Sequence, residues 1–214
     1  MILKAYNPSL TKRLDSYLKR DKKFKKIYQV VQKDFLKADF VAHNWEHIYR
    51  GILNAIAIGE TEKAKMDIVM PAIAMHDIGF LYGATGKTHA EIGAEKLPAY
   101  LKKIKVDYPP EIVKHIVSCI RTHKGSMHNK NPKTLEAKVV ADADLLEKFG
   151  PIGVYQYIRT WAEFKRGIED AIERRNVITN LRLETKTGRK LVERGRKFVI
   201  DFFEKLDKSY NPYR

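Results

Sequence analysis

Two adjacent ionisable residues, His76 and Asp77, end an apolar run over residues 68–75 and precede the apolar residues 78–80. Ionisable groups in such a stretch carry a steep desolvation cost unless they are paired or bind a metal. Successive helical residues project about 100° apart, so at a helix end both side chains can reach one ion. Other His and Asp residues recur where they can complete the ligand shell. The chemistry that this pair predicts is metal-dependent hydrolysis.

A second pair of histidines, His43 and His47, lies upstream in the pentapeptide HNWEH, with both imidazoles on one helix face. The zinc-protease motif requires Glu directly after the first His, where this chain has Asn44, so that class is excluded. The following helix is apolar nearly all round, yet His47, Arg50 and Asn54 share one face of it. A self-satisfied buried polar network is one explanation. A binding site is the other, and it is the one we favour.

Two further histidines are candidates for the same site. His123 falls on the apolar face of a helix expected over residues 109–123, where a packed structural histidine is the alternative to a ligand. His89 begins a helix directly after the loop that follows His76. Because helix starts expose side chains and attract anions, we expect Lys87 and His89 to lie in a pocket.

Two carboxylates, Asp142 and Asp144, stand two residues apart, so on a helix they point in nearly opposite directions and a single site takes one of them. Periodicity mildly favours Asp142, which shares a face with Leu135, Val139 and Leu146. The other face is also apolar, so periodicity leaves both aspartates open.

Helices must position these residues, because helical periodicity dominates the chain and no alternating strand pattern persists. The expected helices are residues 9–19, 21–37, 45–59, 63–78, 88–106, 109–123, 134–149, 150–176 and 186–208. Gly and Pro residues separate them. The sequence therefore predicts an all-α fold with the loops 79–88 and 124–133 at the rim of a pocket.

Composition narrows the class of protein further. The 214 residues, 44% hydrophobic and 31% charged, are typical of a soluble globular chain that buries a full core. The single cysteine, Cys119, excludes an intrachain disulfide and a Cys-rich zinc site, so a metal must use His and carboxylate ligands. The chain lacks an apolar signal core and any run of membrane-spanning length, so we expect a cytoplasmic protein with no membrane partner.

The net charge of +15 is concentrated at the two ends of the chain. Residues 1–40 hold eleven Lys or Arg against four Asp, and residues 181–214 hold ten against five acids. Basic ends suit an anionic partner such as a nucleotide or nucleic acid. The alternative is a solvated helix face, because the basic residues alternate with a helical apolar stripe.

Four sequence blocks in this order resemble the HD-domain metal-dependent phosphohydrolases, whose signature is H…HD…D. The blocks are HNWEHIYR, MHDIG, THAEIGAE and ADADLLEKFGPIG, and the tail TKTGRK…FVIDFF is typical of a small stand-alone branch of that superfamily. The resemblance runs from about His43 to Glu204. It implies a single HD-type helical domain, over residues 41–214, with a metal site in the helix core. Residues 1–40 would be a basic helical extension packed on it.

The resemblance also implies a ligand set of His47, His76, Asp77 and Asp144. The family's last aspartate follows an Ala and precedes a Leu by two residues, which favours Asp144. Asp142 and His43 then become candidates to contact the metal ligands and fix their orientation without binding the metal themselves.

Two departures from the family pattern concern Asn44 and the additional histidines. Many relatives carry Asp at the position of Asn44, so the charge behind the ligands differs here. His89 and His123 resemble the extra ligands of bimetallic relatives, such as cyclic-dinucleotide phosphodiesterases, and are candidates for a second metal or for the substrate. The Gly-Tyr-Pro block of those phosphodiesterases is absent, which argues against cyclic-dinucleotide cleavage.

The expected function is hydrolysis of a phosphomonoester or a nucleotide phosphate by metal-activated water. Mixed His and carboxylate ligands suit Mn, Fe, Ni, Co or Zn, as one ion with a second as an option. Asp77 is the catalytic candidate that orients the water, and Arg50, Lys87 and Lys124 are candidates to hold the phosphate. The partner is then a small phosphorylated substrate, with a nucleotide favoured. The alternative is a non-catalytic nucleotide- or nucleic-acid-binding protein with a structural metal.

Overall fold

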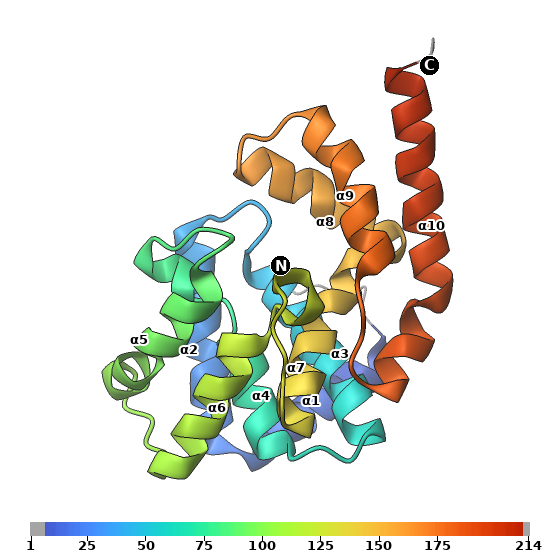
Figure 1. The fold of residues 1–214 in the computed structure, drawn as a ribbon. Helices are drawn as coiled ribbons and strands as arrows, with labels where there is room; N and C mark the ends of the chain where they lie inside the picture. The colour runs from blue at the N-terminus through green and yellow to red at the C-terminus, as the bar shows by residue number, and fades with distance from the viewer. Residues whose placement is uncertain (1–6, 212–214) are drawn as a thin grey trace.

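The computed structural model describes residues 7–211, and within them only the backbone of residues 171, 172, 174 and 175. Helices and connecting loops make up this part of the chain, with no strand, so the predicted all-α fold is confirmed (Figure 1). The α-helices are α1 (Pro8–Arg20), α2 (Lys22–Ala38), α3 (Trp45–Thr61), α4 (Met66–Ala74), α5 (His89–Lys103), α6 (Pro110–Thr122), α7 (Leu135–Leu145), α8 (Gly150–Glu163), α9 (Ile168–Asn180) and α10 (Lys186–Tyr210). Three short 3₁₀ helices are η1 (Ile78–Tyr82), η2 (Gly125–His128) and η3 (Leu146–Lys148). None of these helices is both long and apolar enough to cross a membrane.

Helices α1 and α2 pack one face each on the main body. The α2 face consists of Phe24, Ile27, Val31 and Phe35, all buried at helical spacing. Asp21 separates the two helices and begins α2, because its carboxylate accepts the first free backbone N–H groups of that helix. The lysines of this segment stay on the exposed face.

Helix α3 lies at the centre of the larger core, packed between α4 and α7. Its residues are buried on nearly every side, which explains why its sequence is apolar nearly all round. Helices α8, α9 and α10 form a second, smaller hydrophobic cluster, with Tyr157, Val199 and Phe203 among its buried residues. In Figure 1, α8 and α9 lie above the helices of the first cluster and the long α10 runs along one side.

Two expected helices end earlier than the sequence predicts. The helix expected over 63–78 ends at Ala74, because the side chain of His76 bonds to the carbonyl of Ile73 that the next helical N–H would otherwise use. The helix expected over 150–176 is two helices, since Lys165 adopts a left-handed conformation (φ 51°) that reverses the chain.

Candidate metal centre

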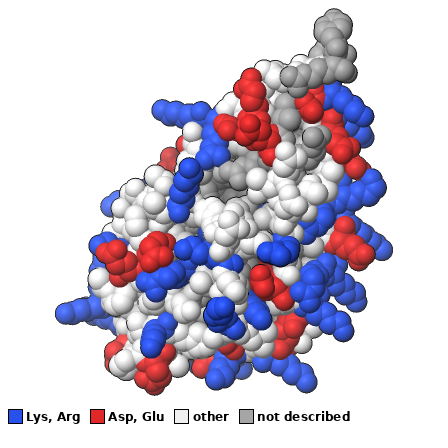
Figure 2. Space-filling model, viewed as in Figure 1, with Lys and Arg blue, Asp and Glu red and all other residues white. Residues whose placement is uncertain are grey.

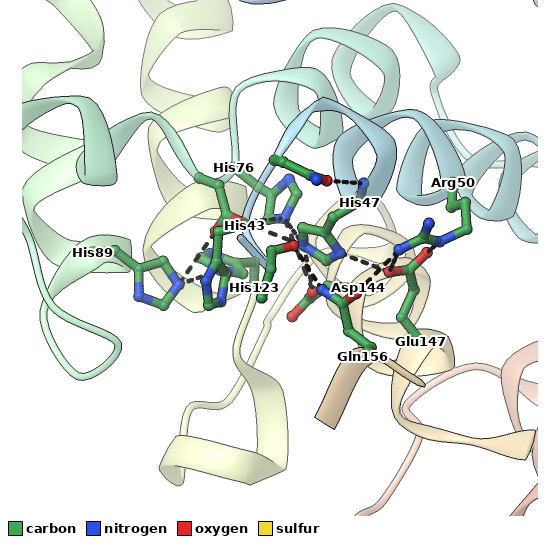
Figure 3. Close-up of polar contacts among 12 residues, drawn as sticks. His43, His47, Arg50, His76, His89, His123, Asp144, Glu147 and Gln156 are labelled. Atoms are coloured by element: carbon green, nitrogen blue, oxygen red, sulfur yellow. Dashed lines mark hydrogen bonds and ion pairs between the residues drawn. The ribbon is translucent and has the colours of Figure 1, made fainter. Parts of the chain in front are cut away.

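Four residues from three helices converge in the core of the larger cluster. His47 is on the first turn of α3, His76 and Asp77 follow α4, and Asp144 is near the end of α7, and each is at most 1% exposed. His47 Nε2 lies 3.1 Å from His76 Nε2, 3.3 Å from Asp77 Oδ2 and 3.3 Å from Asp144 Oδ1. Residues separated by nearly a hundred positions thus present their polar atoms to one point (Figure 3).

The hydrogen bonds on the far side of each imidazole fix its direction. His76 Nδ1 donates to the carbonyl of Ile73 at 2.7 Å, and His47 Nδ1 donates to the carboxylate of Glu147 at 2.7 Å. Since a carbonyl or a carboxylate only accepts, Nδ1 carries the proton in each ring. The Nε2 lone pairs of His47 and His76 therefore face each other at 3.1 Å, an arrangement that needs a cation between them.

The carboxylates complete a site that fits a divalent metal. Both oxygens of Asp77 and Oδ1 of Asp144 are fully buried without a hydrogen-bond partner in the described part of the chain. Buried carboxylate oxygens are costly unless they are paired or coordinate a metal. Ligand atoms of His47, His76 and Asp144 all lie within 4.8 Å of one another. Two imidazoles and two carboxylates are a donor set for a transition metal.

The electrostatics of the site favour the ionised carboxylates. Burial acts to raise the pKa of Asp77, but His76 and its neighbouring imidazoles outweigh burial and hold that pKa well below its usual value. Lys124 does the same for Asp144, with Lys148 second in strength. Burial acts to lower the pKa of His47, yet the nearby carboxylates, Glu147 foremost, hold it well above its usual value. These carboxylates therefore favour a positive charge at the Nε2 side of His47, which a bound metal would supply.

A second pair of imidazoles, His89 and His123, faces the other oxygen of Asp77. Their Nε2 atoms lie 3.1 Å apart, and they are 3.3 Å and 3.7 Å from Asp77 Oδ1 respectively. Each Nδ1 donates to a backbone carbonyl, of Thr85 and Ile120. Burial lowers the pKa of His89 to about 3 and holds that of His123 well below its usual value, so both rings are neutral. They present lone pairs to a further cation or to a ligand with donors.

Local sequence features explain how the chain builds this centre. Asn44 begins α3, and its side-chain oxygen accepts the backbone N–H of His47 at 3.2 Å. Because Asp and Asn serve equally well at this helix position, the departure from the family's Asp keeps its structural role. Gly79 lets η1 touch the start of α5: a Cβ there would lie 2.1 Å from the carbonyl oxygen of His89.

A cavity of about 250 Å³ lies beside these ligands. Its lining includes His43 and His89, the cations Lys87, Lys124, Lys148 and Arg166, and the aromatic residues Tyr157, Trp161 and Phe164 from α8 and its end. Figure 2 shows a hollow in this face of the molecule, with lysine and arginine side chains spread around it and acidic residues among them.

The phosphate-binding candidates lie in different places. Lys87 is exposed at the cavity wall. Lys124 is 4% exposed, and its Nζ lies 3.2 Å from Asp144 Oδ2. Arg50 does not line this cavity: its guanidinium donates to Glu147 and Gln156, and it borders a separate cavity of about 630 Å³.

His43 and Asp142, the two residues expected to support the metal ligands, also lie in different places. His43 lines the 250 Å³ cavity, with Nδ1 bonded to Glu163 and its ring packed on Phe80. Asp142 lies away from the ligands, and its carboxylate accepts three hydrogen bonds from Glu184 and Thr185. Opposite projection of residues two apart on α7 accounts for this, so Asp142 braces the start of α10 rather than a metal ligand.

Sequence reasoning missed Glu147, Lys148, Glu163 and the aromatic wall from α8. A signal for the first two was present, because they follow Asp144 by three and four residues and so share its helix face. The aromatic spacing of Tyr157, Trp161 and Phe164 is equally typical of core packing, and it carried no separate signal.

Comparisons with known proteins define the class. Residues 44–148 match the family model of the HD domain. The uncharacterized protein YpgQ of Bacillus subtilis (strain 168) is 27% identical over 176 residues, which cover 78% of this chain and 84% of YpgQ. A predicted HD superfamily hydrolase from an uncultured Thermotogales bacterium is 26% identical, with a TM-score of 0.59 over 87% of this chain and 92% of that one.

The chain therefore belongs to the HD-domain family, and it has the fold of the HD superfamily hydrolases. A structure of Bacillus subtilis YpgQ in complex with ADP has a TM-score of 0.62 to this chain, at 22% identity, over 87% of this chain and 97% of YpgQ.

Proposed function

We propose that this protein is a metal-dependent phosphohydrolase that cleaves a phosphomonoester or a nucleotide phosphate. One observation carries the proposal: imidazole lone pairs and unpartnered carboxylate oxygens converge beside a cavity lined by cations and aromatic rings. A structural metal site is closed by its ligands, whereas this one adjoins space for a substrate.

His47, His76, Asp77 and Asp144 would hold the metal, which is Mn, Fe, Ni, Co or Zn. When bound, such an ion supplies Lewis-acid activation of a phosphoryl oxygen and of the attacking water. Asp77 directs one oxygen toward His47 and the other toward His89, and we assign it to orient the water. The buried site excludes bulk solvent, which strengthens each of these interactions.

Lysine side chains would bind the phosphate and stabilise its developing charge. Lys124 and Lys148 are buried beside Asp144, and both line the cavity. Lys87 is the third candidate, at the exposed wall. Arg50, the remaining candidate, lies outside the lining of this cavity and donates to Glu147.

A nucleotide is the favoured substrate. Trp161 and Phe164 offer aromatic surface for a base, and the cations of the same cavity suit its phosphates. The complex of YpgQ with ADP supports this choice by likeness. The charges on the face shown in Figure 2 are dispersed, so they offer no comparable argument for nucleic acid as the substrate.

His89 and His123 would bind a second ion or the substrate phosphate. Metal analysis of His123→Ala separates the two roles. Loss of one ion per chain indicates a second metal site, and an unchanged ion count with a raised KM indicates a phosphate-binding role.

A phosphate-release screen over nucleotides and generic phosphomonoesters, with each of the five metals added in turn, tests the proposal. We expect activity from the wild type that Asp77→Ala abolishes. Asp67→Ala, on the exposed start of the helix that ends before His76, is the matched control and should stay active. Activity that survives Asp77→Ala, or no hydrolysis of any substrate with any metal, would contradict the proposal.

A further inference from the structure

Glu147 is a buried carboxylate that touches a metal-ligand candidate without facing the substrate cavity. It is 1% exposed and lies on η3, three residues after Asp144. Its Oε2 accepts the Nδ1 proton of His47 at 2.7 Å. The 250 Å³ cavity beside the metal ligands does not include Glu147 in its lining, whereas the separate 630 Å³ cavity does.

Arg50 holds this carboxylate through both of its oxygens. Its Nε donates to Glu147 Oε1 and its Nη2 donates to Glu147 Oε2 at 3.0 Å, the two-point geometry that fixes a carboxylate most firmly. The same Nη2 also donates to Gln156 Oε1 at 3.2 Å. Arg50 and His47 are one turn apart on α3, so Glu147 bridges two neighbouring side chains of that helix.

Gln156 closes the network from α8. It is 1% exposed, and its amide donates to the backbone carbonyl of Ala42, just before the start of α3. The same helix carries Tyr157 and Trp161, which line the substrate cavity. A continuous run of hydrogen bonds therefore joins the helix that walls the cavity to a metal ligand (Figure 3).

We propose that Glu147 is a positioning residue that aims His47 Nε2 at the metal, and that Arg50 and Gln156 hold Glu147 for this purpose. A carboxylate behind a ligating imidazole fixes the ring and makes its other nitrogen a stronger donor. A buried ion pair is a weak source of stability. The burial of Arg50 and Glu147 together therefore favours a functional role for the pair. The inference rests on the metal site of the proposed function.

Binding of Mn²⁺ alone to chelator-stripped protein, followed by the electron paramagnetic resonance signal of the free ion, tests the proposal. We expect Glu147→Gln, which keeps the shape and removes the charge, to weaken Mn²⁺ binding by about 10- to 100-fold. Arg50→Gln should weaken it through the loss of orientation of Glu147. The double variant should bind no more weakly than Glu147→Gln, because Arg50 acts only through Glu147.

A charge variant that misfolds would also lose Mn²⁺ binding, so Gln156→Ala provides a variant that keeps both charges of the network. We expect it to weaken Mn²⁺ binding by less than about tenfold. Arg13→Gln is the matched control, since Arg13 pairs with Glu60 and borders the same 630 Å³ cavity without reaching the metal ligands. It should leave Mn²⁺ affinity unchanged.

Two failures are distinguishable. A wild-type protein that binds no Mn²⁺ contradicts the metal site and, with it, the proposed function. A wild type that binds Mn²⁺ while folded Glu147→Gln binds equally well overturns the positioning role alone. Independent, additive losses in the double variant also overturn it, because Arg50 would then act by another route.

Discussion

Backbone carbonyls set the direction of three of the four convergent imidazoles. His76 and His123 each bond to the carbonyl three residues earlier, at the end of their own helices, and His89 bonds to Thr85. This local capping turns Nε2 inward without any help from distant residues. His47 is different, because its orientation depends on Glu147, a hundred positions away.

The residue types of the site were predictable to a large extent. His47, His76, Asp77 and Asp144 stood out because ionisable groups in apolar segments need partners. The choice between Asp142 and Asp144 was not decided by periodicity, since both faces of α7 are buried. The role of Arg50 was also missed, because it depends on the contact with Glu147, which lies 97 positions away in the sequence.

Lys148 is expected to contribute to substrate binding. It is 7% exposed, lines the cavity, and has a pKa that burial lowers. Lys148→Gln should reduce kcat/KM for the best substrate about tenfold to a hundredfold, the range of a lost hydrogen bond to a charged group. Metal affinity should remain. Steady-state kinetics beside exposed Lys133→Gln checks this, and an unchanged kcat/KM would remove Lys148 from the site.

At the scale of elements, the ends of helices carry the site. The sequence predicted that His76 and Asp77 end a helix but placed them inside it, because the side chain of His76 replaces a backbone donor and periodicity does not register such a bond. The break between α8 and α9 was missed although Gly167 lies in it, since the residue whose left-handed conformation reverses the chain is Lys165.

Gly79 is expected to be intolerant of a side chain. A Cβ would meet the His89 carbonyl at 2.1 Å, so η1 and α5 would have to separate, and Asp77 would move from His89. Gly79→Ala should lower the free energy of unfolding by about 1–3 kcal/mol and weaken metal binding. Urea unfolding and metal titration measure these effects.

The control for Gly79 is Gly51→Ala, whose Cβ would make ordinary contact with Ile73 at 3.5 Å inside a helix. It should leave stability unchanged or raise it by up to about 1 kcal/mol. Equal losses in the two variants would show that the close approach at Gly79 is unimportant.

Asp142 is expected to be structural. Its carboxylate accepts hydrogen bonds of 2.8, 2.7 and 2.6 Å from Glu184 and Thr185, at the point where α10 begins. Asp142→Ala should lower the free energy of unfolding by about 2–3 kcal/mol while metal affinity stays unchanged. Asp144→Ala should instead lose metal affinity while the free energy of unfolding stays unchanged. Loss of metal binding in folded Asp142→Ala would place that residue at the centre after all.

For the molecule as a whole, two hydrophobic clusters meet along α7, η3 and α8, and the cavity beside the candidate metal centre lies at that junction. The sequence predicted one all-α body but not this division, since helical apolar periodicity runs through both parts of the chain. The basic residues near the N-terminus remain on exposed faces of α1 and α2, as a solvated helix face would require.

Cys119 reports on the integrity of the larger cluster. It is fully buried, and burial raises the pKa of its thiol from 9.0 to about 12. The native protein therefore holds less of the reactive thiolate than an unfolded chain at the same pH, and its buried thiol is also out of reach of a reagent. A thiol reagent at pH 8 should therefore label Cys119 only after unfolding. Rapid labelling in the absence of denaturant would contradict this packing.

The central claim is that the convergent histidines and aspartates form a divalent metal centre. Equilibrium dialysis of chelator-stripped protein against Mn²⁺, followed by metal analysis, tests it most directly. We predict that the wild type retains at least one ion per chain and that folded Asp77→Ala retains none. Equal retention by the two proteins, or no retention by the wild type, would contradict the account.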